Sequence, residues 1–267
     1  MGPHFLIVGA MKAGTTTLYR DLSKHPEVFL PGLKEPNILI DYSDHQAISD
    51  EYSSLFRSAL PGQFCGDAST SYTKLPDYKG VAKNAFAYCG RNLKIIYMRR
   101  EPISRIVSQY KHELQHGTIN DSFDKAIKKV PRLINYSRYD YQIAPWLECF
   151  GPENVLQINL HEYSQLRAEK LDEVYKFLGV SPKTVDELKI DIDKVSNRAN
   201  EAKTIDNPVL RNIIYSAFYQ KGVKRFFSDQ FREKIRNIIL GRPQSNDVEP
   251  SEDACEYILA ELKKTLL

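Results

Sequence analysis

The most constraining stretch of the sequence is a short apolar run that ends in a glycine-bearing loop and continues into a helix-forming segment. The run FLIVGA covers residues 5–10, the loop GAMKAGTT covers residues 9–16, and TTTLYRDLSKHP follows from residue 15. An apolar run of this length is typical of a buried parallel strand. A strand that turns directly into a helix aims backbone N–H groups and the positive end of the helix dipole at one point. The stretch therefore predicts an anion site at the start of the first helix.

The loop resembles a Walker A phosphate loop whose lysine has moved. The pattern G-x-x-x-x-G-K-[ST] is met by Gly9 and Gly14, and Thr16 takes the hydroxyl position. Thr15, however, stands where the lysine is expected, and Lys12 lies inside the loop. A P-loop kinase needs that lysine and Mg²⁺ to hold the β- and γ-phosphates. The pattern favours a shorter anion chain, in which Lys12 reaches a bridging oxygen between two groups.

Strand-like and helix-like segments alternate through the first two thirds of the chain. Further strands are expected at 64–69, 93–100 and 155–160, and helices at 101–117, 141–150 and 164–179. This alternation predicts an α/β, P-loop-like three-layer fold with a central, mainly parallel sheet flanked by helices. From about residue 206 the chain is basic and helix-forming, which predicts a helical C-terminal layer. No linker-like tract interrupts the sequence, so a single domain over residues 1–267 is expected.

Composition excludes several classes of function. The formal net charge of +3 is too small to indicate a nucleic-acid partner. The four cysteines are far apart without a C-x-x-C pair, which indicates neither a disulfide framework nor a zinc site. No apolar stretch approaches the roughly 20 residues of a membrane span, and no signal peptide is recognisable. We therefore expect no membrane span and a cytoplasmic location.

A second basic position follows the strand expected at 93–100. Arg100 lies at the carboxyl end of that strand, where open α/β sheets bind ligands. Ser108 follows two helical turns into the next helix, which begins with Pro102 at its first position. Arg100 and Ser108 could face one phosphate, although an arginine at a strand end is also commonly just solvated.

Together these motifs resemble the sulfotransferases that use 3′-phosphoadenosine 5′-phosphosulfate (PAPS). FLIVGAMKAGTTTL is similar to the family's 5′-phosphosulfate loop, K-x-G-T-T, and IIYMRREPISRIVSQYKH to its 3′-phosphate motif, R-[DE]-P-x-x-R-x-x-S-x-Y. KEPNIL, at 34–39, resembles the family pattern KEPHFF. The resemblance runs from residue 5 to about 180. It is to the carbohydrate branch, heparan-type and bacterial, because the aryl branch usually has tryptophan where Thr17 stands.

The resemblance implies a PAPS site with PAP as the product and no metal. Lys12 would hold the oxygen that bridges phosphorus and sulfur, where charge grows as the S–O bond breaks. Arg100 and Ser108 would bind the 3′-phosphate, and Arg198 and Lys203 lie where relatives close a loop over the nucleotide. The residues assigned to the nucleotide are Lys12, Ala13, Gly14, Thr15, Thr16, Thr17, Arg100, Ser108 and Arg198.

The same resemblance suggests how the acceptor is activated. Glu35, in the KEPNIL segment, would be the general base, although it could instead pair with Lys34 on a surface loop. His25 is the alternative base, although a lone histidine before Pro26 is more commonly structural. The family often has a sulfate-handling lysine where Ala68 stands, and Lys74 is a possible substitute. Tyr72 is expected either to line the acceptor site or to belong to the core.

Transfer of a sulfuryl group to a hydroxyl or amine, most readily of a saccharide, is the function that these residues favour. The partners would be the nucleotide donor and a small-molecule or glycan acceptor. Three alternatives stay open. They are a P-loop small-molecule kinase, a catalytically inactive nucleotide-binding protein, and a sulfotransferase acting on a phenol or lipid hydroxyl.

Overall fold

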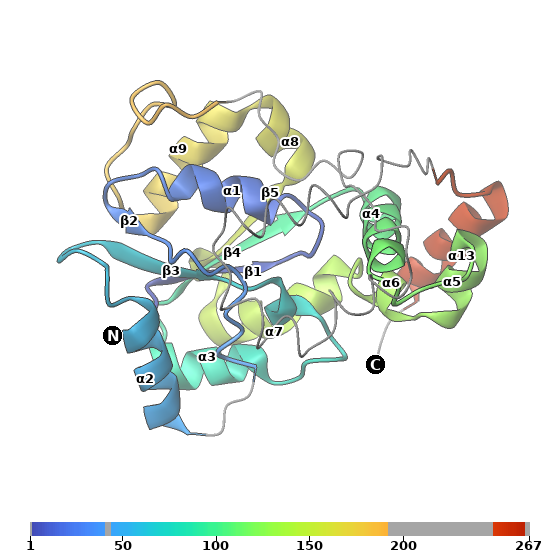
Figure 1. The fold of residues 1–267 in the computed structure, drawn as a ribbon, viewed down its shortest axis with the longest axis horizontal. Helices are drawn as coiled ribbons and strands as arrows, with labels where there is room; N and C mark the ends of the chain where they lie inside the picture. Colours follow the sequence, from blue (N-terminus) through green and yellow to red (C-terminus); the bar gives the residue numbers. More distant parts are fainter. Residues whose placement is uncertain (1, 41–43, 192–247, 265–267) are drawn as a thin grey trace, which may run out of the picture.

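A five-stranded, all-parallel sheet forms the centre of the molecule (Figure 1). The computed structural model describes residues 2–40, 44–191 and 248–264. The strands, in the spatial order β2-β3-β1-β4-β5, are β1 (Phe5–Gly9), β2 (Val28–Phe29), β3 (Phe64–Ala68), β4 (Lys94–Arg99) and β5 (Val155–Asn159). The four predicted strands are confirmed to within a residue at either end. Strand β2 was not predicted, because two residues carry no recognisable period.

Helices cover both faces of the sheet, which confirms the predicted three layers. On one face lie α1 (Thr15–Leu22), α8 (Leu160–Gln165) and α9 (Arg167–Leu178). On the other lie α2 (His45–Leu55), α3 (Val81–Cys89) and α7 (Tyr139–Phe150). Two short 3₁₀ turns, η1 (Thr70–Thr73) and η2 (Pro152–Asn154), complete these layers. Because both faces are covered, every residue of β1 is buried, as its unbroken apolar run predicts.

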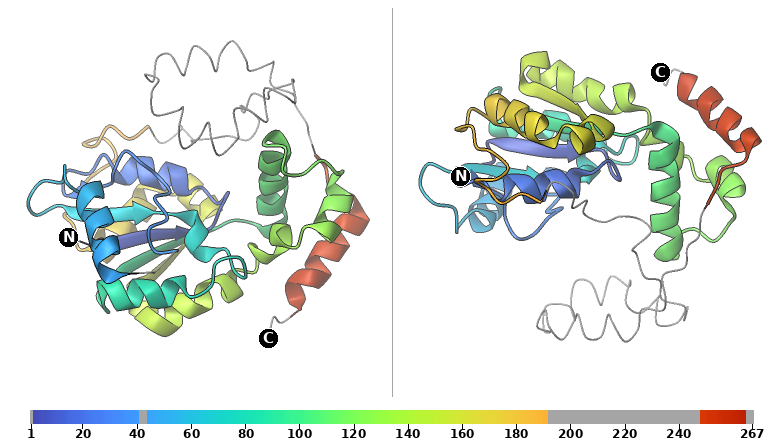
Figure 2. Two further views of the ribbon diagram at one scale, coloured as in Figure 1. Left: turned by 60° about the horizontal axis from the view of Figure 1, so that its bottom comes forward. Right: turned by 90° about the horizontal axis from the view of Figure 1, so that it is seen from above.

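A second group of helices lies beyond the carboxyl ends of the strands (Figure 2). It contains α4 (Pro102–Gln115), α5 (Phe123–Lys129), α6 (Arg132–Asn135) and α13 (Glu252–Lys263). Ile106, Tyr110, Ile134 and Ile258 belong to its own apolar core, separate from that of the sheet. The C-terminal helix α13 therefore packs on α5 and α6, not on the sheet. The other helices expected after residue 206 lie outside the described residues.

Helix α4 carries a row of buried polar side chains that its apolar periodicity did not predict. Arg105 is completely buried and donates to Gln109 Oε1 at 2.8 Å and to the Leu133 carbonyl at 2.6 Å. It also donates to the carbonyl of Met11, at 3.4 Å, in the loop after β1. Burial lowers the pKa of Arg105 to about 10. This guanidinium thus ties α4 to α6 and to the loop after β1, which fixes one wall of the site described below.

Other features of the described structure bear on the predicted class. All four cysteines are free thiols. In the three described ranges, no helix combines the length and the apolar character that crossing a bilayer requires. Within the same ranges, no three histidine, cysteine or acidic side chains are grouped as a metal ion would need.

Candidate active site

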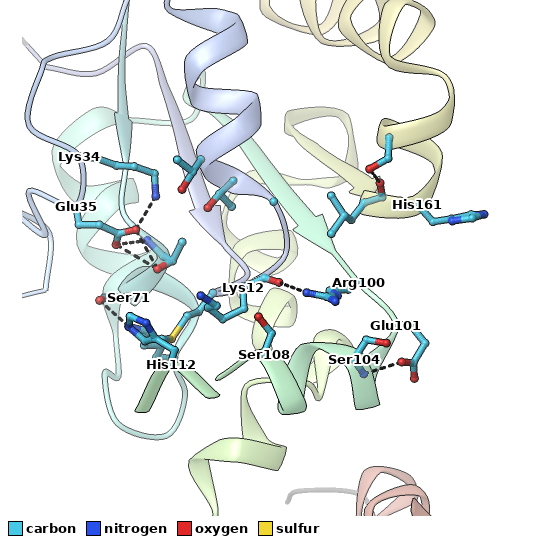
Figure 3. A pocket seen from close by; sticks show the side chains of 18 of the residues that line it. Lys12, Lys34, Glu35, Ser71, Arg100, Glu101, Ser104, Ser108, His112 and His161 are labelled. Atoms are coloured by element: carbon cyan, nitrogen blue, oxygen red, sulfur yellow. Dashed lines mark hydrogen bonds and ion pairs between the residues drawn. The ribbon is translucent and has the colours of Figure 1, made fainter. Parts of the chain in front are cut away.

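A cleft of about 900 Å³ opens at the carboxyl edge of the sheet (Figure 3). Segments that follow all five strands contribute to it: 11–16, 34–37, 70–74, 100–112 and 160–164. The chain passes from β3 to β4 on the other side of β1, so the order of strands reverses at β1. Such a reversal is where open parallel sheets bind ligands. The cleft is therefore in the position that the fold class predicts for a substrate.

The loop between β1 and α1 forms the floor of the cleft. Gly14 precedes the helix with a φ of 88°, a left-handed conformation that favours glycine. A Cβ atom at Gly14 would lie 2.4 Å from Cδ1 of Leu160, so the position also lacks space for a side chain. Gly14, the residue before α1, has no side chain that could cap the first amides of the helix. Thr15 and Thr16 line the cleft at this point, and the helix start is available to an anion.

Lys12 extends from this loop into the middle of the cleft (Figure 3). Its backbone has a φ of 66°, and its carbonyl accepts from Arg100 Nη1 at 3.4 Å. Burial lowers the pKa of Lys12 below its ordinary value, and the charges of Arg100 and Lys34 lower it further. The protein thus concentrates positive charge at the start of α1, and an anion bound there would relieve the repulsion.

Arg100 and Ser108 line the neighbouring wall (Figure 3). Arg100 is held by Tyr139, whose hydroxyl donates to the Arg100 carbonyl at 2.6 Å and accepts from its N–H at 3.3 Å. Glu101 accepts from the amides of Ile103 and Ser104, so it caps α4. No carboxylate in the described chain forms an ion pair with Arg100. Its guanidinium and the Ser108 hydroxyl therefore lie together on this wall of the cleft, without a carboxylate to neutralise the arginine.

Glu35 lies on the opposite side of the cleft from this wall (Figure 3). Its carboxylate accepts from the Thr70 amide at 2.7 Å and from Lys34 Nζ at 2.8 Å. The structural alternative, an ion pair with Lys34, is therefore present, and yet the carboxylate remains on the cleft surface with a third of its side chain exposed. Lys74 also lines the cleft and donates to Ser71 Oγ at 3.2 Å, whereas Ala68 is buried at the end of β3.

His112 lines the cleft and was missed by the sequence analysis. It lies one helical turn beyond Ser108, and the i, i+4 spacing that places both on one face of α4 could have identified it. Burial lowers the pKa of His112 to about 4, and the nearby His116 and Lys12 lower it as well. The imidazole is therefore neutral near pH 7 and can accept a hydrogen bond or a proton.

Two predicted acceptor-side residues lie elsewhere. His25 is buried and donates through Nε2 to the Ser181 carbonyl at 2.8 Å, while its Nδ1 accepts from the Glu27 amide. It is not on the cleft, so of the two alternatives for His25, a base or a structural histidine, the structural one is correct. Tyr72 is also buried, and its hydroxyl donates to Asp67 at 2.6 Å. Of the two alternatives for Tyr72, the core is correct.

Some residues assigned to the nucleotide do not reach the cleft. Ala13 and Thr17 are buried and are absent from its lining. The Ala13 amide is used within the loop, where it donates to the Ala10 carbonyl at 3.2 Å. Arg198 and Lys203 lie outside the described residues, so their assignment stays a prediction.

The fold and the cleft together define a class of protein: a parallel α/β protein whose cleft is formed by a strand–loop–helix turn that carries a lysine and by an arginine directly after the adjacent strand. Sequence comparison places it within that class. The sulfotransferase domain family matches residues 2–239, and the chain belongs to this family.

Individual relatives agree with this assignment. The chain is 28% identical over 200 residues to human bifunctional heparan sulfate N-deacetylase/N-sulfotransferase 3, a match that covers 67% of this chain and 22% of the relative. It is 23% identical over 249 residues to mouse carbohydrate sulfotransferase 15, of which 44% is covered. The chain thus spans about a fifth to under half of these relatives. A sulfotransferase from Alicyclobacillus acidocaldarius superimposes with a TM-score of 0.59 and 26% identity, over 84% of this chain and 94% of that one.

Proposed function

We propose that the protein transfers a sulfuryl group from PAPS to a hydroxyl or amine of an acceptor, most readily a saccharide. The observation that carries this proposal is the position of Lys12, whose ammonium lies in the cleft at the start of α1. Arg100 and Ser108 supply a second anion position on the same cleft. A nucleotide with a 5′-phosphosulfate and a separate 3′-phosphate has anionic groups to match both.

The residues of the cleft fit such a donor. The start of α1, with Thr15 and Thr16, would bind the 5′-phosphosulfate, and Arg100 with Ser108 would bind the 3′-phosphate. A volume of about 900 Å³ is at the upper end of the usual range for ligand sites, which leaves room for an acceptor beside the nucleotide. A mouse sulfotransferase complexed with PAP shares the fold, with a TM-score of 0.50 and 16% identity.

Lys12 would act on the leaving group. When the acceptor attacks sulfur from the side opposite the nucleotide, the S–O bond to the 5′-phosphate breaks and its electrons stay on that oxygen. The Lys12 ammonium would stabilise this growing charge. A group that binds charge present only in the transition state raises kcat, so this position is effective for catalysis. The lowered pKa of Lys12 also makes the ammonium a stronger hydrogen-bond donor.

Glu35 would accept the proton that the acceptor loses. Its carboxylate lies on the cleft, and the bonds from Thr70 and Lys34 fix its orientation. The Thr70 amide, the Thr70 hydroxyl and the Lys34 ammonium all stabilise the charged carboxylate, whose two oxygens have about four lone pairs and can still accept from the acceptor hydroxyl. His112 is a second candidate, because its imidazole is on the cleft and its lowered pKa keeps it neutral. Substitution of each residue in turn distinguishes which of the two is the base.

A saccharide acceptor is supported by the relatives and by the polar character of the cleft. Heparan sulfate N-deacetylase/N-sulfotransferase 3 and carbohydrate sulfotransferase 15 are named for saccharide substrates. Hydroxyl and amine groups of sugars suit a wall that contains Thr70, Ser71 and Asn37. A phenol or lipid hydroxyl would be expected to need a more apolar wall.

The direct test is sulfuryl transfer from radiolabelled PAPS to a library of saccharides, phenols and lipid alcohols. Labelled product is expected with a saccharide, and Lys12→Ala should abolish it while changing PAP affinity less. Phosphoryl transfer from Mg·ATP without response to PAPS would favour the kinase. Calorimetric binding of PAP without transfer to any acceptor would indicate an inactive nucleotide-binding protein instead.

A further inference from the structure

A buried carboxylate lies behind the loop that carries Glu35, and none of the steps above uses it. Asp67, near the end of β3, has no exposed surface. Three hydroxyls donate to it: Ser69 Oγ to Oδ1 at 2.8 Å, and Tyr72 and Tyr52 to Oδ2 at 2.6 Å and 2.9 Å. Asp67 is not on the cleft. Removing a carboxylate from water costs free energy, so the role of the hydrogen bonds that Asp67 accepts needs to be explained.

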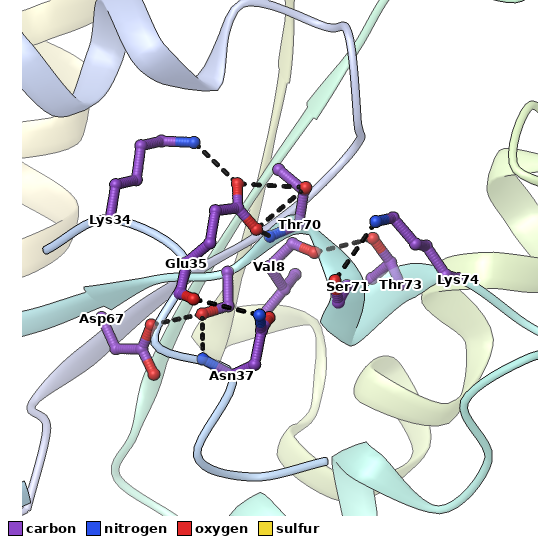
Figure 4. A network of polar contacts seen from close by, with 10 residues as sticks. Val8, Lys34, Glu35, Asn37, Asp67, Thr70, Ser71, Thr73 and Lys74 are labelled. Atoms are coloured by element: carbon purple, nitrogen blue, oxygen red, sulfur yellow. Dashed lines mark hydrogen bonds and ion pairs between the residues drawn. The ribbon is translucent and has the colours of Figure 1, made fainter. Parts of the chain in front are cut away.

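Two of the three hydroxyls connect Asp67 to the loop, and Figure 4 shows the connection that ends at Asn37. Ser69 Oγ accepts from the Asn37 amide at 3.1 Å, and Tyr72 OH accepts from the Leu39 amide at 3.3 Å. Each hydroxyl has a single hydrogen. Because that hydrogen is directed to Asp67, the lone pairs remain for the loop amides. The charge of Asp67 thus determines the direction of both hydrogen-bond relays.

The loop is one that needs such support. Glu35 and Asn37 have φ values of 61° and 58°, in the left-handed region that residues with side chains adopt at a cost. Asn37 Nδ2 donates to the Glu35 carbonyl at 3.0 Å, and the Glu35 amide donates to the Ala68 carbonyl at 2.9 Å. A strained backbone persists only where the surrounding contacts determine it. The relays from Asp67 fasten the loop at Asn37 and Leu39, directly after Glu35.

We propose that Asp67 is a positioning residue, which acts through Ser69 and Tyr72 to hold residues 35–39 so that the Glu35 carboxylate faces the acceptor. The catalytic part of this inference rests on the proposed function. The conformational part does not, because the relays involve only side chains and amides of this chain. The two parts can therefore be tested separately.

Tyr72 and Tyr52 offer a matched pair of variants. Each hydroxyl donates to the same oxygen of Asp67, but only that of Tyr72 also accepts a loop amide. Tyr72→Phe should increase backbone hydrogen exchange of residues 37–40 at least tenfold and lower kcat at least tenfold, with PAP affinity unchanged. Tyr52→Phe should leave the exchange and kcat within about threefold of the wild type.

Asp67→Asn tests the direction of the relays. The amide retains one oxygen, but its NH₂ group must face either Ser69 or the tyrosines. The hydroxyl that accepts from this NH₂ group would turn its own hydrogen towards the loop amide. Two hydrogen-bond donors, the hydroxyl and the loop N–H, would then face each other. The same loss of exchange protection and of kcat as in Tyr72→Phe is expected. The tyrosine pair still decides the question where Asp67→Asn does not fold.

A double-mutant cycle with Glu35→Gln completes the design. If Tyr72 acts through Glu35, Tyr72→Phe should lower kcat no further in the Glu35→Gln protein. Equal effects of Tyr72→Phe and Tyr52→Phe on exchange would overturn the conformational part. Full additivity with Glu35→Gln would overturn the catalytic part. If the wild type transfers no sulfuryl group, the proposed function fails, and the exchange measurements still decide whether Asp67 holds the loop.

Discussion

At the scale of single residues, Lys12 combines charge with burial in a way that predicts the pH dependence of turnover. Its pKa is lowered by burial first and then by Arg100 and Lys34, so the free protein loses this proton at a pH below 10.5, the ordinary lysine value. The proposed role needs the ammonium form. A bound phosphosulfate attracts that form, which raises the pKa again within the complex.

The pH at which activity falls on the alkaline side should therefore differ between kcat/KM and kcat. With a hydroxyl acceptor, kcat/KM is expected to fall as the pH rises through a pKa below 10.5, because it reports the free enzyme. The fall in kcat should come at higher pH. Lys12→Arg should move the limb of kcat/KM out of the measurable range, since a guanidinium stays protonated. An unchanged limb in Lys12→Arg would assign the titration to another group.

Glu35 and His112 both line the cleft, so each is a candidate for the base. Substitution distinguishes them. Glu35→Gln can still accept from the Thr70 amide but cannot take a proton, so kcat should fall roughly 100-fold or more with PAP affinity retained. His112→Gln, the matched variant, should have a smaller effect. Steady-state kinetics with calorimetry of PAP checks both. A retained kcat in Glu35→Gln, with a large loss in His112→Gln, would make His112 the base.

At the scale of the elements, α1 is fixed to the helices of its own layer by a buried ion pair. Asp21 in α1 receives Nε and Nη2 of Arg167, each at 2.8 Å, and the hydroxyl of Tyr163 at 2.5 Å. Both charged side chains are almost fully buried. This pair connects α1 with α8 and α9, and so it holds the helix whose start forms the anion site.

Removing one charge from this pair should destabilise the fold. Asp21→Asn would leave a buried guanidinium opposite a neutral amide, which typically costs about 3–5 kcal/mol. Glu187→Gln is a suitable control, since its pair with Lys183 is exposed and should contribute little to stability. Urea unfolding of the two variants measures the difference. Equal unfolding midpoints would show that the buried pair stabilises no more than the exposed one.

Sequence reasoning identified what is determined locally and missed what depends on tertiary contacts. Strands β1 and β4 were predicted because unbroken apolar runs are enough to define buried parallel strands. Pro102 correctly marked the start of α4. Arg105 could not be predicted as buried, since its partners come from Met11 and Leu133, distant in the sequence. The relays from Asp67 were missed for the same reason, whereas β2 was missed because its two residues carry no recognisable period.

The candidate site was predicted to a similar extent. Lys12, Arg100 and Ser108 belong to motifs with fixed spacing, and all three line the cleft. His25 was chosen for its chemistry alone, and only the structure shows that its ring contacts Ser181 and Tyr175 in the interior. His112 follows from the face of α4 that Ser108 occupies, but only once that face is known to point into the cleft.

At the scale of the whole molecule, the cleft lies where two apolar cores meet. The sheet and its helices form one core, and α4, α5, α6 and α13 form the other (Figure 2). Helix α4 belongs to the second core, yet it carries Ser108 and His112 on the cleft wall. The position of the 3′-phosphate site should therefore depend on how well the second core is packed, including the C-terminal helix far along the chain.

Neighbouring residues of α13 allow this dependence to be measured. Ile258 is fully buried in the second core, whereas the adjacent Leu259 is 48% exposed. Ile258→Ala should lower the free energy of unfolding by about 2–5 kcal/mol, because it leaves a cavity, and Leu259→Ala should change it by less than about 1 kcal/mol. If the second core holds the wall, Ile258→Ala should also weaken PAP binding by calorimetry, with Leu259→Ala unchanged. Weaker stability with unaltered PAP affinity would mean that Arg105, through its bonds to the loop after β1, is sufficient to keep α4 in place.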